Sequence, residues 1–433
     1  MNRTLTLKLL ALSMLALVLI VALARIGWKV DERRATRDTA VAGIAAQYAE
    51  AQQFTGPVLW LECRETREKE TRNCSRTVRP ESLTGTGELA VSERYRGIYK
   101  ARVYLASLRS EAAFAPAPLT FAKNQTLTGA YWVFGVSDPR GIKRIEVRDG
   151  NGATLVARPG TRGSPLANGF HIPVALEKLS TSQALVADIE LAGTGGYEWV
   201  PVADANDFQL RSAWAHPSFS GRYLPETRSI TPQGFAARWR VNAFAAGGDN
   251  VLDKATTHYG DEVPAQFAHS LGVSLVDPVD AYVQSDRAMR YGFLFVLLTL
   301  GGFFLFELLK RRTLHPLQYQ LIGFAIVVFF LLLIALAEHI GFAAAYVIAA
   351  AACTTMIALY GRTLLASWKA AAMLAAGYAG LFAGLYQLLA SEDHALLLGA
   401  WLTFIVLAAT MYLTRRLDWS AVGRTVQPVA QPE

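Results

Sequence analysis

Residues 316–337 read PLQYQLIGFAIVVFFLLLIALA, an apolar run without a charged side chain. A helix needs about 20 such residues to cross the hydrocarbon core of a bilayer, so this segment predicts a transmembrane helix. Further apolar runs of similar length lie before and after this segment in the chain: Leu5–Ala24, Tyr291–Leu309, Gly341–Tyr360, Ala370–Leu389 and Ala395–Leu413. The sequence therefore predicts a multi-pass membrane protein with one large domain, residues 26–290, outside the bilayer.

The composition of the chain agrees with a membrane protein. Of its 433 residues 52% are hydrophobic and only 18% are charged, and the net charge is +7. A positive charge can indicate a nucleic acid partner, but no basic stripe interleaved with aromatic residues is present. We therefore expect the lipid bilayer as a partner and no nucleic acid.

Basic side chains are confined to one set of the short loops between the predicted helices. The links on the other side, residues 338–340 and 390–394, contain neither Lys nor Arg. Because Lys and Arg mark cytoplasmic loops, both termini and the tail, residues 415–433, are expected in the cytoplasm. The large domain is then expected on the opposite side. The basic residues concerned are Lys310, Arg311, Arg312, Arg362, Lys369, Arg415 and Arg416.

The first apolar run allows two interpretations. Arg3, Lys8 and the sequence Ala22-Leu23-Ala24 also fit a secretory signal with a cleavage site. We favour an uncleaved anchor helix over residues 1–25, because the run is long enough to span the bilayer. Cleavage after Ala24 is the alternative.

The large domain is dominated by apolar residues with a period of two. Residues 99–105 and 235–243 alternate in this way, which predicts half-buried strands. Turn sequences at 138–141 and 149–152 separate further strands, whereas residues 31–53 predict a helix that leaves the first membrane segment. The fold class is therefore an α+β membrane protein: an N-terminal transmembrane helix, a large antiparallel β-rich domain, built as a sandwich or as two linked β units, and a bundle of five transmembrane helices over residues 291–414.

Two of the three cysteines lie in the large domain. Cys63 and Cys74 flank a charged stretch that follows strand-like residues 58–61, so they could join the base of a hairpin in an oxidising compartment. Such a disulfide would contribute roughly 2–3 kcal/mol. Free thiols, metal ligation and redox chemistry are the alternatives. Cys353 lies in the middle of a membrane segment, where a packing role is expected.

Ionisable residues at the membrane boundary are the candidates for function. Glu338 and His339 end one predicted helix, and Asp393 and His394 emerge on the same side. These residues could assemble a metal or proton site if their loops meet, but the favoured explanation is that they are solvated loop residues and helix caps. We therefore predict no metal ligand, and the hypothesis is that Glu338 and His339 orient the outer loops against the large domain.

Two further histidines belong to motifs of their own. His315 precedes Pro316 at the start of a helix, where a cap is expected. His216 lies in the aromatic cluster of residues 214–219, where a turn packed on a sheet is favoured over a peptide or glycan contact. No catalytic motif or cofactor-binding loop is present, so no catalytic residue and no cofactor are predicted.

The chain resembles the CreD family of inner-membrane proteins of Gram-negative bacteria, also called cell envelope integrity proteins. The residues that carry this resemblance cover nearly the whole chain: Asp138-Pro139-Arg140-Gly141-Ile142, residues 214–219, Tyr223-Leu224-Pro225, Asp286-Arg287-Ala288, Phe306-Glu307, residues 314–319, residues 338–342, residues 396–399 and Leu413-Thr414-Arg415. Cys63 and Cys74 are not part of the recognised pattern.

The resemblance implies location and physiology more than chemistry. It implies a protein of the inner membrane that is induced by a two-component system. It also implies roles in envelope integrity, colicin tolerance and responses to cell-wall antibiotics. It brings no catalytic residue, cofactor or transported substrate.

The leading functional hypothesis is a non-enzymatic envelope protein whose β domain binds a periplasmic or cell-wall partner. The alternative is a membrane enzyme or transporter that acts on lipid or cell-wall precursors, which requires the polar residues at the outer edge to converge. A sensor is disfavoured, because the inner loops are too short to form an output domain.

Overall fold

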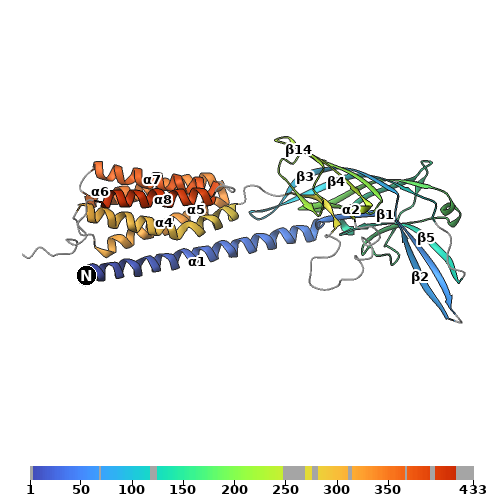
Figure 1. Cartoon of the computed structure of the whole chain (residues 1–433), viewed down its shortest axis with the longest axis horizontal. Helices are drawn as coiled ribbons and strands as arrows, with labels where there is room; N and C mark the ends of the chain where they lie inside the picture. Colours follow the sequence, from blue (N-terminus) through green and yellow to red (C-terminus); the bar gives the residue numbers. More distant parts are fainter. Residues whose placement is uncertain are drawn as a thin grey trace, which may run out of the picture. The chain divides into compact units, whose positions relative to one another are not determined.

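The computed structural model describes residues 3–67, 70–117, 124–246, 269–275, 281–310, 315–365, 368–390 and 395–415. The chain forms two compact units (Figure 1). The membrane unit comprises Met1–Thr36 and Val279–Glu433, and the β unit comprises Arg37–Pro278. Both borders of the β unit differ from the predicted limits, residues 26 and 290. The reason is that helix α1 (Arg3–Tyr48) continues without a break beyond its apolar run, and helix α4 begins at Ala281.

The membrane unit consists of apolar helices. All six predicted runs are helical. Among the described residues, five helices are long and apolar enough to span a bilayer, and residues 399–412 of the last helix form a shorter apolar segment. The protein is therefore a multi-pass membrane protein. Besides α1 and α4, the helices are α5 (Pro316–Ile340), α6 (Phe342–Leu365), α7 (Trp368–Ala390) and α8 (Ala395–Thr414).

Aromatic side chains fill the core of the membrane unit. Phe329 lies at its centre, with ring centroids 4.6 Å from Phe382, 5.4 Å from Tyr346 and 6.3 Å from Phe295. These four residues come from four helices. Since lipid tails are as apolar as these rings, close packing and not exclusion of water holds the helices together.

The described residues of the β unit form two eight-stranded sheets. The strands of the first sheet follow the order β13-β16-β11-β1-β5-β9-β8, and β2 pairs with β1 off this path. The bounds of these strands are β1 (Gln52–Arg67), β2 (Glu70–Val78), β5 (Gln125–Val136), β8 (Arg158–Pro159), β9 (Gly169–Pro173), β11 (Gly196–Val200), β13 (Pro217–Gly221) and β16 (Leu271–Leu275).

The second sheet follows the order β14-β15-β12-β3-β4-β10-β6-β7. Short 3-10 helices, η1 (Pro139–Gly141) and η2 (Leu176–Ser180), and helix α2 (Ala243–Ala246) link strands of the unit. The strands of this sheet are β3 (Ser82–Arg96), β4 (Tyr99–Phe114), β6 (Ile142–Asp149), β7 (Thr154–Leu155), β10 (Gln183–Thr194), β12 (Ala205–Ser212), β14 (Thr227–Thr231) and β15 (Gly234–Asn242).

The two sheets share one hydrophobic core, as in a sandwich. Trp199 of the first sheet stacks on Phe208 of the second, with ring centroids 5.0 Å apart. Gly85 and Gly87 on β3 make room for the indole, because a Cβ atom at either position would lie 3.1 Å from it. The pairing is mainly antiparallel, as expected, but β1 pairs with β11 and β3 pairs with β12 in parallel. These parallel pairs join strands distant in sequence, which turn patterns cannot predict.

The end of α1 packs on the outer face of the second sheet. Ile44 is buried against Ala101 and Val103 of β4, and this cluster is separate from the core between the sheets. The alternation predicted for residues 99–105 is therefore present. However, Ala101 and Val103 face α1, whereas the neighbouring Tyr104 points into the sandwich.

Candidate functional site

A wide groove of about 1060 Å³ lies on the outer face of the second sheet. Its floor is the backbone of the central strands, and alternate side chains of these strands stand in it because neighbouring residues of a strand point to opposite faces. The strand register places one side chain from each of seven strands in a single row across the groove. This row runs Thr227, Arg238, Gln209, Thr86, Arg109, Asp188 and Glu146.

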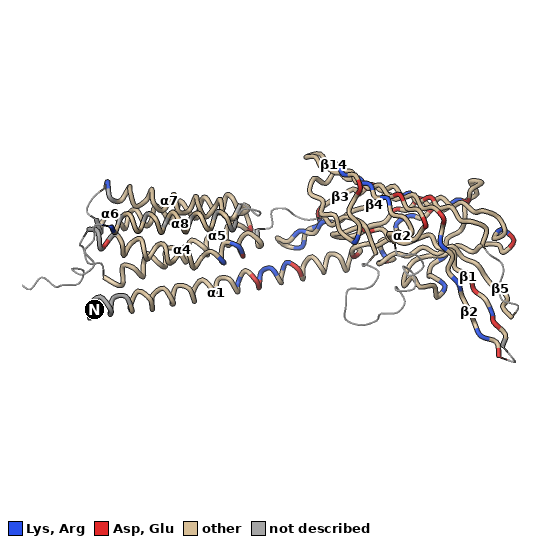
Figure 2. The backbone as a smooth tube through the Cα atoms, viewed as in Figure 1, with Lys and Arg blue, Asp and Glu red and all other residues tan. Residues whose placement is uncertain are grey.

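The groove carries both signs of charge, and Figure 2 shows Lys or Arg and Asp or Glu alternating over these strands. Asp188 is shared by two arginines: Arg109 Nη1 lies 3.6 Å from its carboxylate, and Arg148 also contacts it. Glu146 contacts Arg144 at 2.8 Å. These side chains are about one- to two-thirds exposed, so each pair contributes little stability but stays accessible to a ligand.

Cross-strand ion pairs fix the positions of the guanidinium groups on the other side of the groove. Arg238 donates from Nε to Asp207 at 2.8 Å, and this hydrogen bond lowers the pKa of Asp207 below its ordinary value. Arg211 Nη2 lies 3.0 Å from Glu88. Asp207 is therefore ionised at neutral pH, and both ion pairs orient their arginines before a ligand arrives.

The chemistry of this surface suits an extended polar ligand. Guanidinium groups bind carboxylates or phosphates, the carboxylates bind amino groups, and Thr86, Thr227 and Gln209 supply neutral donors and acceptors. Among the residues that line the groove in the described part of the chain, none is aromatic. A sugar ring would therefore find no aromatic side chain to stack on among these lining residues. Residues 144–148 have a period-two pattern of Arg-Ile-Glu-Val-Arg that could have revealed this face from the sequence.

The family marker Asp138-Pro139-Arg140-Gly141 forms a clamp on the end of α1. Asp138 caps η1 by accepting from the backbone N–H of Arg140 at 3.0 Å, and it also accepts from the N–H of Glu50 at 3.0 Å. Arg140 donates from Nε to Asp138 at 2.9 Å and from Nη1 to the carbonyl of Ala46. That carbonyl is one of the last in α1, where helix carbonyls lack intrahelical partners. The hydrogen bonds from Arg140 hold the pKa of Asp138 below its ordinary value.

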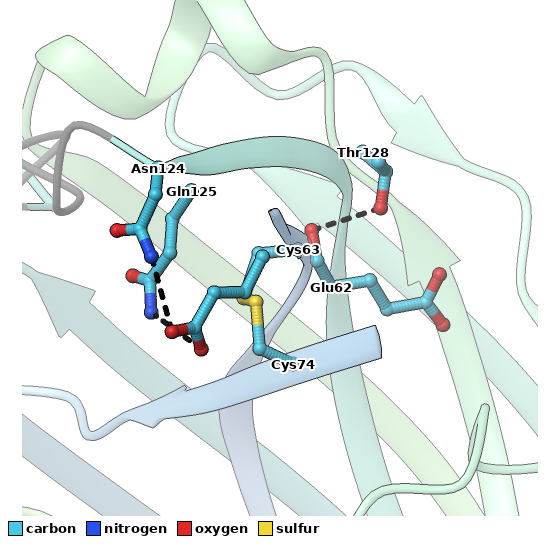
Figure 3. The surroundings of a disulfide bond; sticks show 7 residues. Glu62, Cys63, Cys74, Asn124, Gln125 and Thr128 are labelled. Carbon is cyan, nitrogen blue, oxygen red and sulfur yellow. Dashed lines mark hydrogen bonds between the residues drawn. A yellow bond between two sulfur atoms is a disulfide. The ribbon is translucent and has the colours of Figure 1, made fainter. Parts of the chain in front are cut away.

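Cys63 and Cys74 lie directly opposite each other on β1 and β2 and form a disulfide, with Cα atoms 4.8 Å apart (Figure 3). The Cys63 side chain is buried. On the neighbouring strand β5, Thr128 donates to the carbonyl of Glu62 at 3.1 Å. The disulfide therefore joins the two strands of a hairpin, as the sequence predicted. Its position between paired strands, with Cys63 buried, indicates a structural role.

Glu338 lies at the end of α5 within the membrane unit. Its side chain is only 9% exposed, it accepts from the Tyr282 hydroxyl of α4 at 3.1 Å, and Arg33 Nε of α1 lies 3.6 Å away. It thus connects three helices. The adjacent His339 is exposed, and Asp393 and His394 lie outside the described residues.

His315 caps the opposite end of α5. Its Nδ1 accepts from the N–H of Leu317 at 3.3 Å, and Gln318 completes the capping box. His315 and Glu338 are thus separated by the length of this helix and cannot share a site. Close to His315, Tyr319 donates to the buried Glu307 at 2.6 Å. Within the described ranges, no group of three or more His, Cys, Asp or Glu side chains could hold a metal ion.

His216 belongs to the turn before β13. Trp214 donates from Nε1 to the carbonyl of His216 at 2.9 Å, and the Arg102 guanidinium lies 4.4 Å from the Trp214 ring centroid. Trp214 and Phe219 pack against the core of the sandwich. The cluster is a turn packed on a sheet, as the sequence favoured, and His216 itself is exposed.

Comparison with known proteins agrees with these observations. The family model described as inner membrane protein CreD matches residues 4–420. The chain belongs to the CreD family. Inner membrane protein CreD of Escherichia coli (strain K12) is 35% identical over 349 residues, which cover 79% of this chain and 76% of that protein. For a CreD family member, the clamp and the groove add what the sequence markers alone did not reveal: the partners of Asp138 and Arg140, and a polar groove on the second sheet.

Proposed function

We propose that this protein is a non-enzymatic component of the inner membrane that supports envelope integrity, and that its β unit binds a periplasmic or cell-wall partner in the groove of the second sheet. The observation that carries the proposal is the row of preoriented guanidinium and carboxylate groups around Arg109, Asp188 and Glu146. An extended envelope molecule that carries both carboxylates and amino groups fits these charges.

The groove can be tested by photo-crosslinking in intact envelopes. A photoreactive amino acid replaces Thr86, which is exposed in the middle of the groove. The matched control replaces Thr71, an exposed threonine on β2. We expect a crosslinked envelope product from position 86 and none of that product from position 71.

A charge-reversal variant tests whether the crosslinked product is bound by the groove arginines or only lies near position 86. Arg109→Glu with Arg148→Glu should abolish the product at position 86, because both guanidinium groups contact Asp188 in the groove. Arg72→Glu with Arg76→Glu, the same charge change on exposed positions of β2, should leave it unchanged. Equal crosslinking at both threonines, or a product that survives the groove variant, contradicts the proposal. A product made of a lipid-linked precursor instead supports the membrane-enzyme or transporter alternative.

The orientation proposed with this function has its own test. The bias of basic residues among the short loops supports a periplasmic β unit and cytoplasmic termini. Alkaline phosphatase fused after Asp207 should be active, and fusions after Leu314 and Glu433 should be inactive. An active enzyme at either of the latter positions reverses the proposed orientation. The intact mass of the purified protein reports whether the chain is cleaved after Ala24.

A further inference from the structure

The turn between β3 and β4 differs in character from the rest of the β unit. It reads Arg94-Tyr95-Arg96-Gly97-Ile98-Tyr99-Lys100, and Figure 2 shows Lys and Arg gathered at this end of the hairpin. Tyr95 is 65% exposed and Ile98 is 51% exposed. Two large side chains of this kind at the tip of a hairpin contribute nothing to the core of the sandwich.

The charge of this tip is strongly positive. Between residues 93 and 102 there are four basic side chains and one acidic side chain, which gives a net charge of 4 − 1 = +3. The single carboxylate, Glu93, is engaged within the hairpin: it accepts from the Tyr95 hydroxyl, and it pairs with Arg102. Lys100 Nζ also lies 3.9 Å from Glu93, and the net charge of +3 makes the surface beside Tyr95 and Ile98 positive.

Contacts with α1 set the direction of the hairpin. Arg94 lies 6.0 Å from the ring centroid of Tyr48, whereas Arg96, closer to the turn, lies against Gly43. Residues nearer the turn thus contact earlier residues of α1. Within the β unit the hairpin therefore runs along the last turns of α1, and the apolar run of this helix precedes Gly43 in the chain.

We propose that the tip formed by residues 94–100 is an interfacial anchor that binds anionic phospholipid at the surface of the bilayer. Arginine and lysine bind lipid phosphates, and tyrosine with an aliphatic neighbour is the usual composition of a segment that enters the headgroup region. The protein's own membrane supplies this ligand. The anchor is independent of the groove, and it restrains the β unit by a second attachment besides the covalent links to the helices.

The proposal can be tested on the full chain in lipid nanodiscs. Cys353→Ser removes the unpaired thiol, and Ile98→Cys then accepts an apolar, environment-sensitive fluorophore while the Cys63–Cys74 disulfide is kept. Val156→Cys, at a site 74% exposed in another loop of the β unit, is the matched control. Quenching by spin-labelled phospholipid measures how close each fluorophore lies to the bilayer.

In nanodiscs of equal parts phosphatidylglycerol and phosphatidylcholine, quenching at position 98 should exceed that at position 156 by at least about twofold, because the basic tip is attracted to anionic lipid. Arg94→Glu with Arg96→Glu, phosphatidylcholine alone, or high salt should each remove this excess, since the attraction is electrostatic. Arg72→Glu with Arg76→Glu on β2 should preserve it. Equal quenching at both positions, or an excess that persists after both the charge reversal and the removal of phosphatidylglycerol, overturns the proposal.

Discussion

The membrane unit and the β unit both bury large aromatic side chains, but different forces hold them together. Trp199 in the sandwich and Phe329 in the helix bundle are each at most 2% exposed. Unfolding of the β unit exposes Trp199 to water, whereas separation of the membrane helices exposes Phe329 to lipid. The two units also differ in where their charged side chains lie. In the β unit these side chains cover a face of a sheet, whereas in the membrane unit Glu307 and Glu338 lie near helix ends.

The largest expected difference between the units concerns these two aromatic residues. Trp199→Ala should lower the free energy of unfolding of the β unit by about 3–5 kcal/mol, because it removes transferred apolar area and leaves a cavity beside Phe208. Phe329→Ala should cost roughly half of that or less, since lipid replaces water in the reference state. Urea titration in detergent, with strand and helix content followed by circular dichroism, measures both. Similar losses would show that the two cores are held by the same force.

The clamp on α1 should be next in magnitude. Asp138→Asn should cost the β unit about 2–3 kcal/mol, because it weakens charge-assisted hydrogen bonds from Arg140. Asp204→Asn is the control: this carboxylate is 54% exposed, pairs with Arg79 at 3.2 Å, and should cost less than about 1 kcal/mol.

The clamp also predicts a dependence of stability on pH. The folded state lowers the pKa of Asp138, so its contribution is fully present above the unfolded value of about 3.9 and is lost as the pH falls through the folded value. Between neutral pH and strongly acidic pH, the native chain should therefore lose more stability than the Asp138→Asn variant. Parallel pH curves for the two proteins would exclude this role of Asp138.

The disulfide should contribute stability locally. Cys63→Ser with Cys74→Ser should destabilise the β1–β2 hairpin by roughly 2–3 kcal/mol, because a closed loop of this size restricts the unfolded chain. Faster proteolysis within the hairpin would report the loss, while the rest of the β unit keeps its strand content. Non-reducing peptide mapping of the native protein should recover both cysteines in one linked peptide. Two free thiols from oxidised envelopes would refute the bond.

The smallest effect is expected in the membrane unit. Glu338→Gln should lower its stability by about 1 kcal/mol, because the amide keeps a hydrogen bond to Tyr282 but loses the attraction to Arg33. His339→Ala, at the exposed neighbouring position, should change it by less than about 0.5 kcal/mol. Thermal unfolding in detergent compares the two. Equal losses would indicate that both residues, as the sequence suggested, act together at this boundary.

Several of these features could be predicted from residues close together in the chain. The apolar runs were long enough to identify the membrane helices, because a helix in lipid satisfies its backbone within one segment. Period-two alternation predicted strands such as β15, in which Phe235, Ala237, Trp239 and Val241 face the core. The turn at 138–141 and the pairing of Cys63 with Cys74 also follow from short-range patterns.

What the tertiary structure alone decided are the contacts between segments far apart in sequence. The sequence marked Asp138 and Arg140 but not their partners, Ala46 in α1 and Glu50 just after it, and it could not show that Ala101 and Val103 face that helix. The groove likewise depends on a register that brings Glu146, Asp188 and Arg109 into one row. The physical reason is that periodicity records only which face of a strand is apolar. Which strands become neighbours is set by packing of the whole sandwich, and this places the charges of separate strands on one surface.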